Sequence, residues 1–182
     1  MGYQGPAERI FFEAFQAHLN EVGTPSQVKP PEGSAPFYGL ITQLEGFGAG
    51  EQALNFEFSA PPGVSDPESG TFLCQIFVVL ASGISQDAHQ AVSWLNDRLN
   101  SRVSLGAFGL VEENGTLYYK QGTVVDGELD TVAQVRGVDR QIGLMIHMLQ
   151  TFTDLLLAVK DGADPAEALG EHPLARAFAQ AG

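Results

Sequence analysis

The most regular pattern in this chain is a series of apolar residues between positions 135 and 159. Their separations alternate between three and four residues, as they do along one side of an α-helix. The residues of this series are Val135, Val138, Ile142, Met145, Leu149, Phe152, Leu156 and Val159. Ile146, Leu155 and Leu157 add apolar groups on neighbouring sides of the same helix. The pattern predicts one long helix that begins near Asp130 and packs against more than one other element.

A helix this long and apolar could also cross a bilayer. The segment 142–159 contains His147, Gln150 and Asp154, whereas a membrane span needs about twenty apolar residues without buried charge. We therefore interpret it as a buried amphipathic helix. The N-terminus lacks the basic and apolar parts of a signal peptide, and Cys74 is the only cysteine, so there is no intrachain disulfide. These features favour a cytoplasmic protein.

Five segments have the patterns of β-strands. Apolar and polar residues alternate around Leu54, Phe56 and Phe58, which is typical of a strand with one buried face. The segment 71–81 is apolar at both sets of alternating positions, so we expect it to lie centrally in a sheet or to be covered on both faces. The other strands are expected at 37–44, 105–112 and 116–123, the last two joined as a hairpin through Glu113-Asn114-Gly115.

Two further helices complete the pattern. Pro6 opens the first, which ends before Gly23 and Pro25, and Ser85 is a suitable N-cap for the second. The segment 24–36 holds four prolines and no periodicity, so we expect a surface loop there. The order α-β-β-β-α-β-β-α predicts an α+β fold in which helices pack on a five-stranded antiparallel sheet. We expect a single domain over residues 1–162 and a C-terminal tail over 163–182 with short helices at 165–169 and 174–179.

The charge distribution limits the classes of partner. The formal net charge is −13, and no basic residue occurs between Lys29 and Arg98. Nucleic acids and anionic membranes are bound through Lys and Arg, so we expect neither as a partner. An acidic stretch of this length either keeps the protein soluble or attracts a basic protein partner.

The sequence contains no recognisable catalytic, cofactor-binding or metal-binding set of residues. None of the four histidines has another His or a Cys at the spacing of metal ligands, and no Gly-x-Ser-x-Gly motif occurs. The glycines of the segment 46–50 lack both the spacing of a dinucleotide-binding loop and the lysine of a P-loop. Cys74 lies within an apolar strand with no nearby base. We therefore expect no catalytic activity, no cofactor and no metal.

A resemblance to a known family rests on the segment 72–119. An apolar strand, Phe72 to Leu80, leads through Ser85 to a helix that ends Leu-Asn-Asp-Arg-Leu-Asn at position 100. A Gly-x-Phe strand at 106–108 and the acidic Asn-Gly hairpin follow, then Leu-Tyr-Tyr at 117–119. This succession resembles the YbjN family. The resemblance implies a fold like that of type III secretion chaperones and a homodimeric, chaperone-like or regulatory protein that binds other proteins without catalysis.

Four residues on the first predicted strands are candidates for partner binding: Phe37, Ile41, Phe47 and Glu51. If the outer face of these strands is exposed, a partner segment could add to the sheet edge or lie across it. Two alternatives remain open. A pocket between sheet and helices, lined by Phe56, Phe58, Phe77, Trp94 and Phe108, would indicate a small-molecule-binding domain or an enzyme. The chain could also be a structural subunit of a larger assembly.

Overall fold

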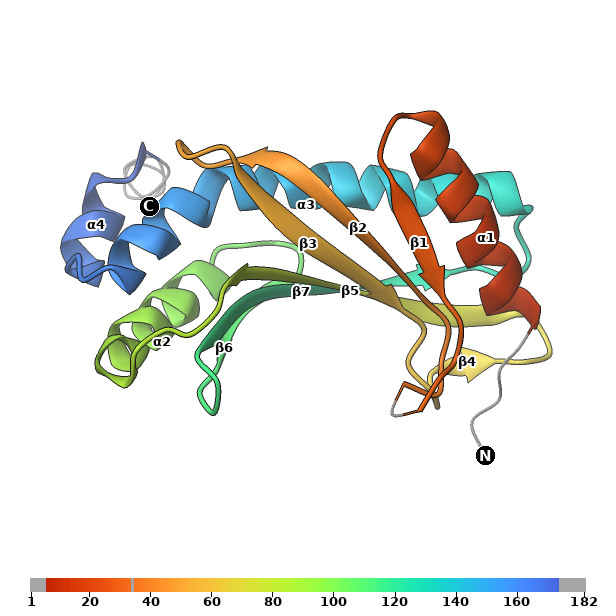
Figure 1. Ribbon diagram of the computed structural model, residues 1–182, viewed down its shortest axis with the longest axis horizontal. Coiled ribbons are helices and arrows are strands. Elements are labelled where there is room, and N and C mark those ends of the chain that lie inside the picture. The colour runs from red at the N-terminus through yellow and green to blue at the C-terminus, as the bar shows by residue number, and fades with distance from the viewer. Residues whose placement is uncertain (1–5, 34, 174–182) are drawn as a thin grey trace.

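The computed structural model describes residues 6–33 and 35–173, which form one antiparallel sheet with helices packed against it (Figure 1). The elements in chain order are α1 (Pro6–Glu21), β1 (Ser26–Lys29), β2 (Gly39–Phe47), β3 (Gln52–Ser59), β4 (Ser65–Asp66), β5 (Thr71–Ala81), α2 (Gln86–Asn100), β6 (Ala107–Val111), β7 (Thr116–Val125), α3 (Thr131–Lys160) and α4 (Pro165–Glu171). The expected α+β class with an open antiparallel sheet is confirmed.

The spatial order of the strands is β1-β2-β3-β5-β7-β6, and the short β4 pairs with the start of β5. Every strand pair is antiparallel. The apolar strand β5 lies in the middle of this order, as its composition predicts. One face of β5 is buried and the other is half-buried, in strict alternation along its whole length. The inner face therefore belongs to the core and the outer face does not.

The prediction of five strands is wrong, because the described residues contain seven. The segment expected to be a proline-rich loop contains β1, which pairs with β2 and forms the edge of the sheet. Side chains of α1 hold this short strand: Gln16 donates to the carbonyl oxygen of Ser26 at 2.8 Å, and the Ser26 amide donates to Asn20 at 3.0 Å. These bonds from α1 and the pairing with β2, rather than local sequence preference, define β1. The second unexpected strand, β4, has only two residues.

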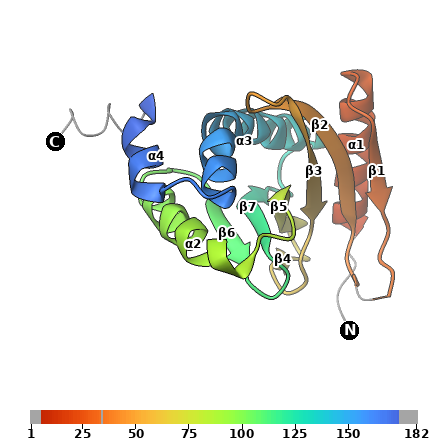
Figure 2. The ribbon, with the colours of Figure 1, turned by 60° about the vertical axis from the view of Figure 1, so that its left-hand side comes forward.

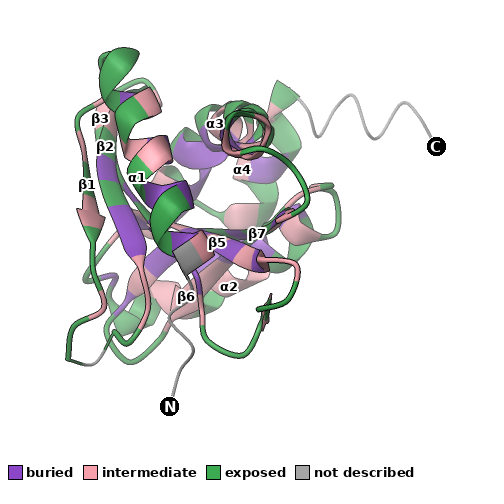
Figure 3. Ribbon diagram, turned by 90° about the vertical axis from the view of Figure 1, so that its right-hand side faces the viewer, coloured by how far each residue is buried: buried purple, intermediate pink, exposed green. Residues whose placement is uncertain are grey.

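The core lies between the inner face of the sheet and the helices. Figure 2 shows that the sheet curves around α3, and Figure 3 shows buried residues where strands and helices face each other. Phe11 and Phe15 of α1 are fully buried. The ring centroid of Phe11 lies 5.6 Å from that of Phe72. The ring centroid of Phe15 lies 5.2 Å from that of Phe58. Burying each such ring contributes roughly 2 kcal/mol to stability, so this aromatic cluster fixes α1 on the sheet.

The long helix α3 confirms the prediction from the apolar series. Asp130 is its N-cap and accepts a hydrogen bond from the Ala133 amide at 2.8 Å. All eight residues of the series are buried, and the helix contacts α1, α2, α4, β2 and β7. Among the described residues α3 is the one helix long and apolar enough to cross a membrane. Its packing instead makes it the core helix of a small globular domain, which is consistent with a soluble protein.

The hairpin β6–β7 and the C-terminal helix also follow the sequence. Gly115 has a positive φ of 63°, and a Cβ atom there would lie 2.4 Å from the carbonyl oxygen of Ile84. Ser85 occupies the N-cap position of α2, although its side chain makes no capping hydrogen bond. After Gly162, α4 forms at the expected place and packs on α2 and α3, with Leu169 buried. The helix expected at 174–179 lies outside the described residues.

Candidate functional site

Two side chains with unusual pKa values are structural parts of the core. Cys74 is fully buried, and burial raises the pKa of its thiol to about 12. Burial also raises the pKa of Tyr119 to about 12, and its hydroxyl donates to the carbonyl oxygen of Leu105 at 2.6 Å. Both groups are therefore protonated at neutral pH and inaccessible to a substrate. Within 6–33 and 35–173, no three His, Cys, Asp or Glu side chains come together in a way that could hold a metal ion.

Three of the four histidines are engaged in contacts that stabilise the fold. His89 lies 3.1 Å from the carbonyl oxygen of Ile84, at the start of α2. His172 stacks on Phe152 with 5.4 Å between ring centroids. His18 lies 3.5 Å from a carboxylate of α3 and joins α1 to that helix. Each of these three side chains links two segments of the chain.

The glycine-containing turn between β2 and β3 binds a carboxylate of its own chain. The Ala49 amide donates to both carboxylate oxygens of Asp154, at 2.9 and 3.0 Å. Gly48 has a positive φ of 69°, and a Cβ atom there would lie 2.3 Å from an Asp154 oxygen. The glycine thus allows the turn to approach α3 closely. The segment forms the turn of the β2–β3 hairpin, and Asp154 occupies the Ala49 amide, a backbone group that could otherwise bind an anion.

The structure does not bring the four predicted partner-binding residues together on one surface. Phe37 is half-buried before β2, Ile41 is 38% exposed on the outer face, and Glu51 is exposed in the β2–β3 turn. Phe47 is only 1% exposed and its ring packs 5.8 Å from that of Phe56. The expectation that Phe47 lies on an accessible face is therefore wrong. The register shift between Leu44 and Phe47 reverses the side on which this residue points.

At each edge of the sheet, helix side chains bond the backbone of one residue. β2 has no free edge, because β1 pairs along it, and the Ser26 backbone of β1 is bonded to α1. At the opposite edge, Asn100 of α2 donates to the carbonyl oxygen of Phe108 and accepts from its amide, each at 2.8 Å. The side chain of Asn100 thus replaces the neighbouring strand that β6 lacks. A partner strand cannot add directly beside β2, because β1 occupies that position.

The outer face of the sheet, opposite the four described helices, carries a stripe of apolar side chains. We call it the apolar stripe and define it by Leu73, Phe77 and Val79 of β5 with Tyr118 and Val124 of β7. The rings of Phe77 and Tyr118 stack with 4.8 Å between centroids and 24° between planes. Val124 is 66% exposed, whereas the other four residues are half-buried. These side chains alternate with the buried residues of the same strands and point away from the core.

Few charged residues project from the strands themselves. The six strands of the main order contain four Asp, Glu, Lys or Arg residues, which are Lys29, Glu45, Glu57 and Lys120, and all four are exposed. The other acidic residues of the predicted acidic stretch lie outside these six strands, in turns, in β4 and in α2. The strands are therefore formally neutral in a chain of net charge −13.

A hollow of about 560 Å³ lies over β1, β2 and β3, beside the apolar stripe. Ile41 lies in it together with polar side chains such as Gln27, Gln43 and Glu57. Gln43 donates to Asn55 at 3.3 Å across β2 and β3. One half of the outer face is therefore polar and hollowed, whereas the half over β5 and β7 is apolar.

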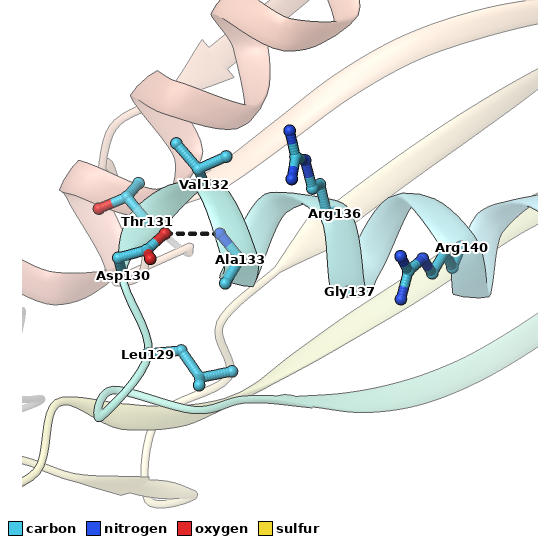
Figure 4. A pocket seen from close by; sticks show the side chains of 8 residues that line it. All are labelled: Leu129, Asp130, Thr131, Val132, Ala133, Arg136, Gly137 and Arg140. Carbon is cyan, nitrogen blue, oxygen red and sulfur yellow. Dashed lines mark hydrogen bonds between the residues drawn. The ribbon is translucent and has the colours of Figure 1, made fainter.

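A second hollow, of about 720 Å³, lies at the start of α3 (Figure 4). Its lining includes Leu129 and Val132, which are 50% and 60% exposed, and the arginines Arg136 and Arg140. Figure 4 shows the Asp130 carboxylate bonded to the first turn of α3, with both arginines on later turns. The hollow combines apolar surface with two positive charges.

The five aromatic residues considered for a ligand pocket do not surround a common cavity. Phe56, Phe58 and Phe108 belong to the packed core. Phe77 lies on the outer face, and Trp94 lies on α2 with the guanidinium of Arg98 5.2 Å from its ring centroid. The apolar stripe was not identified from sequence, although the signal was present in the apolar outward positions of 71–81. The pattern favours a strand that is central or covered on both faces. β5 is central, and none of the described helices lies over its outer face.

Comparison with known proteins identifies neither a family nor a curated relative of this chain. No model of a known protein family matches the chain, and no curated protein matches it at a significant level.

Proposed function

We propose that this protein is a non-enzymatic protein-interaction module that binds through the outer face of its sheet. The observation that carries the proposal is the apolar stripe, which lies outside the core and beneath none of the described helices. Contiguous apolar patches on a soluble protein mark interaction surfaces. Aromatic residues such as Phe77 and Tyr118 are also enriched where proteins bind each other.

The neighbouring strand β3 provides an internal comparison. Its outward positions hold Asn55, Glu57 and Ser59, the polar pattern of an antiparallel sheet with one solvated face. The corresponding outward positions of β5 hold Leu73, Gln75, Phe77 and Val79. A face exposed only to water favours polar outward residues, as on β3. The apolar outward residues of β5 therefore support an outer face that a partner covers.

The resemblance to the YbjN family suggests which kind of interaction protein this is. It implies a chaperone-like or regulatory protein that acts as a homodimer. The helix side chains that bond the backbone of Ser26 and Phe108 at the two edges favour binding across the face over the addition of a strand. The absence of a recognised catalytic set in the sequence agrees with a role in binding.

A second candidate function is the binding of a small organic anion at the start of α3. The hollow there favours it, because Arg136 and Arg140 could pair with a carboxylate while Leu129 and Val132 contact an apolar part. Thermal-shift measurements with a panel of organic carboxylates, on the wild type and on the Arg136→Ala/Arg140→Ala variant, test this candidate. Stabilisation of both proteins alike, or of neither, would contradict it.

The main proposal is tested by site-specific photocrosslinking in the cells that make the protein. A photoreactive residue replaces Val79 on the apolar stripe, and a control variant carries it at Leu144, which is 55% exposed on α3. We expect a protein adduct from position 79 and little from position 144. Equal labelling at both positions, or none at position 79, would contradict binding through the outer face.

A further inference from the structure

On the outer face of the sheet, residues of opposite charge lie on the two sides of β5. Strand pairing places Glu57 of β3 opposite Phe77, and Phe77 opposite Lys120 of β7. The three side chains thus form one row across the outer face, with an acidic and a basic residue about 4.8 Å on either side of the aromatic ring. Neither Glu57 nor Lys120 forms an ion pair with another described residue; the pairs found lie elsewhere.

From this row we infer that a second copy of the chain packs on the outer face, around a twofold axis that runs parallel to β5 above Phe77. Rotation by 180° about such an axis places the β3 side of one copy over the β7 side of the other. Each row of residues then faces the same row of the second copy. Glu57 then faces Lys120 of the second copy, and Lys120 faces Glu57 of the second copy, while the two Phe77 rings meet. The inference rests on the proposed function and names its partner.

The next row along the strands supports the same axis. Strand pairing aligns Asn55 with Val79, and Val79 with Tyr118. The rotation brings the amide of Asn55 opposite the phenol of Tyr118 in the second copy, so a hydrogen-bonding group meets another, and Val79 meets Val79. In both rows, the residues of one copy are therefore complementary to the same row of the second copy, as an isologous interface requires.

The charges also select this axis over the perpendicular one. A twofold axis that runs along the row, at right angles to the strands, would place Lys120 opposite Lys120 and Glu57 opposite Glu57. Like charges in direct contact across an interface are strongly unfavourable. The parallel axis instead gives two attractive contacts and aligns the two sheets, which is a common way for sheets to pack face to face.

The size and overall charge of the face suit a second copy. The six strands are 4 to 11 residues long. At about 3.3 Å per residue along a strand and about 4.8 Å between strands, they present roughly 750 Å² in all, close to the approximately 800 Å² per partner of a standard interface. The net charge of −13 repels two copies at long range, but this repulsion is screened beyond about 8 Å at physiological ionic strength. At the interface itself, the strands carry two residues of each sign.

The test uses charge reversal in the purified full-length chain, with mass measured by light scattering and native mass spectrometry. We expect a dimer for the wild type. Glu57→Lys and Lys120→Glu each turn two attractive contacts into two repulsive ones, so each should weaken dimerisation at least about tenfold. A mixture of the two single variants should form a mixed dimer, because both of its contacts are attractive, and the double variant Glu57→Lys/Lys120→Glu should dimerise again. Glu51→Lys, which makes the same charge change in the β2–β3 turn, is the control and should remain dimeric.

Three outcomes would overturn the inference. A monomeric wild type would do so and would leave the proposed function to be decided by the crosslinking at position 79, which then reports a different protein. A dimer that tolerates both reversals as well as it tolerates Glu51→Lys would place the interface elsewhere. Folded single variants that neither form the mixed dimer nor recover in the double variant would refute the direct pairing of Glu57 with Lys120.

Discussion

The side chain of Asn100 makes two hydrogen bonds to the backbone of Phe108, and its removal should measurably destabilise the fold. Asn100→Ala leaves the amide and the carbonyl of Phe108 without these partners at a partly buried edge. Each lost bond costs about 1 kcal/mol, whereas Ala at the last position of α2 gains up to about 0.5 kcal/mol in helix propensity. The expected net loss is about 1.5 kcal/mol, or a fall of roughly 3–6 °C in Tm for a domain of this size.

The loss is measured by urea unfolding, followed by the fluorescence of Trp94, the only tryptophan. Ser101→Ala is a matched control, because Ser101 also bonds a backbone carbonyl through its side chain but at an exposed position. We expect the control to change the unfolding free energy by less than about 0.5 kcal/mol. A similarly small change for Asn100→Ala, with an unaltered dependence on urea, would refute the role assigned to Asn100.

Three further predictions concern the core and the β2–β3 turn. Gly48→Ala should destabilise the protein clearly more than Gly46→Ala in thermal unfolding, because both glycines have positive φ but only at Gly48 would the new Cβ atom meet Asp154. Phe47→Ala should cost about 3–5 kcal/mol in urea unfolding, since its ring is buried; a loss below about 1 kcal/mol would contradict the burial. The pKa of the Cys74 thiol is raised from 9.0 to about 12 in the folded protein. Folding therefore favours the protonated thiol, whose contribution to stability is full below pH 9 and is lost as the pH rises towards 12. The unfolding free energy should accordingly fall above pH 9, less steeply in Cys74→Ala, and a thiol reagent at pH 8 should label Cys74 only after unfolding.

Elements with strong local sequence patterns could be predicted from sequence. Elements whose position depends on contacts with another helix or strand could not. The apolar series and Asp130 predict α3 correctly, and the Asn114-Gly115 turn predicts the hairpin of β6 and β7. In contrast, β1 has four residues between prolines, and its position depends on hydrogen bonds from α1. Sequence periodicity contains no information on such bonds, so the segment resembles a loop.

The candidate site shows a similar limit. Phe47 follows an irregularity in the pairing of β2 and β3, so counting alternate positions from Ile41 assigns it to the wrong face. The apolar positions of β5 indicate a strand with little contact with water, but they do not say what covers each face. Only the arrangement of the helices shows that Phe77 and Val79 lie outside the core.

The side chains bonded at the two sheet edges have a consequence for how this protein can associate. An unpaired strand edge accepts another strand and presents a new edge, so contacts of that type continue into filaments. Here Asn100 at one edge, and Gln16 with Asn20 at the other, occupy backbone groups that would begin such growth. A sheet has only one face opposite its helices, and contact through that face leaves none to propagate. The side chains that complete the fold therefore oppose strand addition at the backbone groups that they occupy.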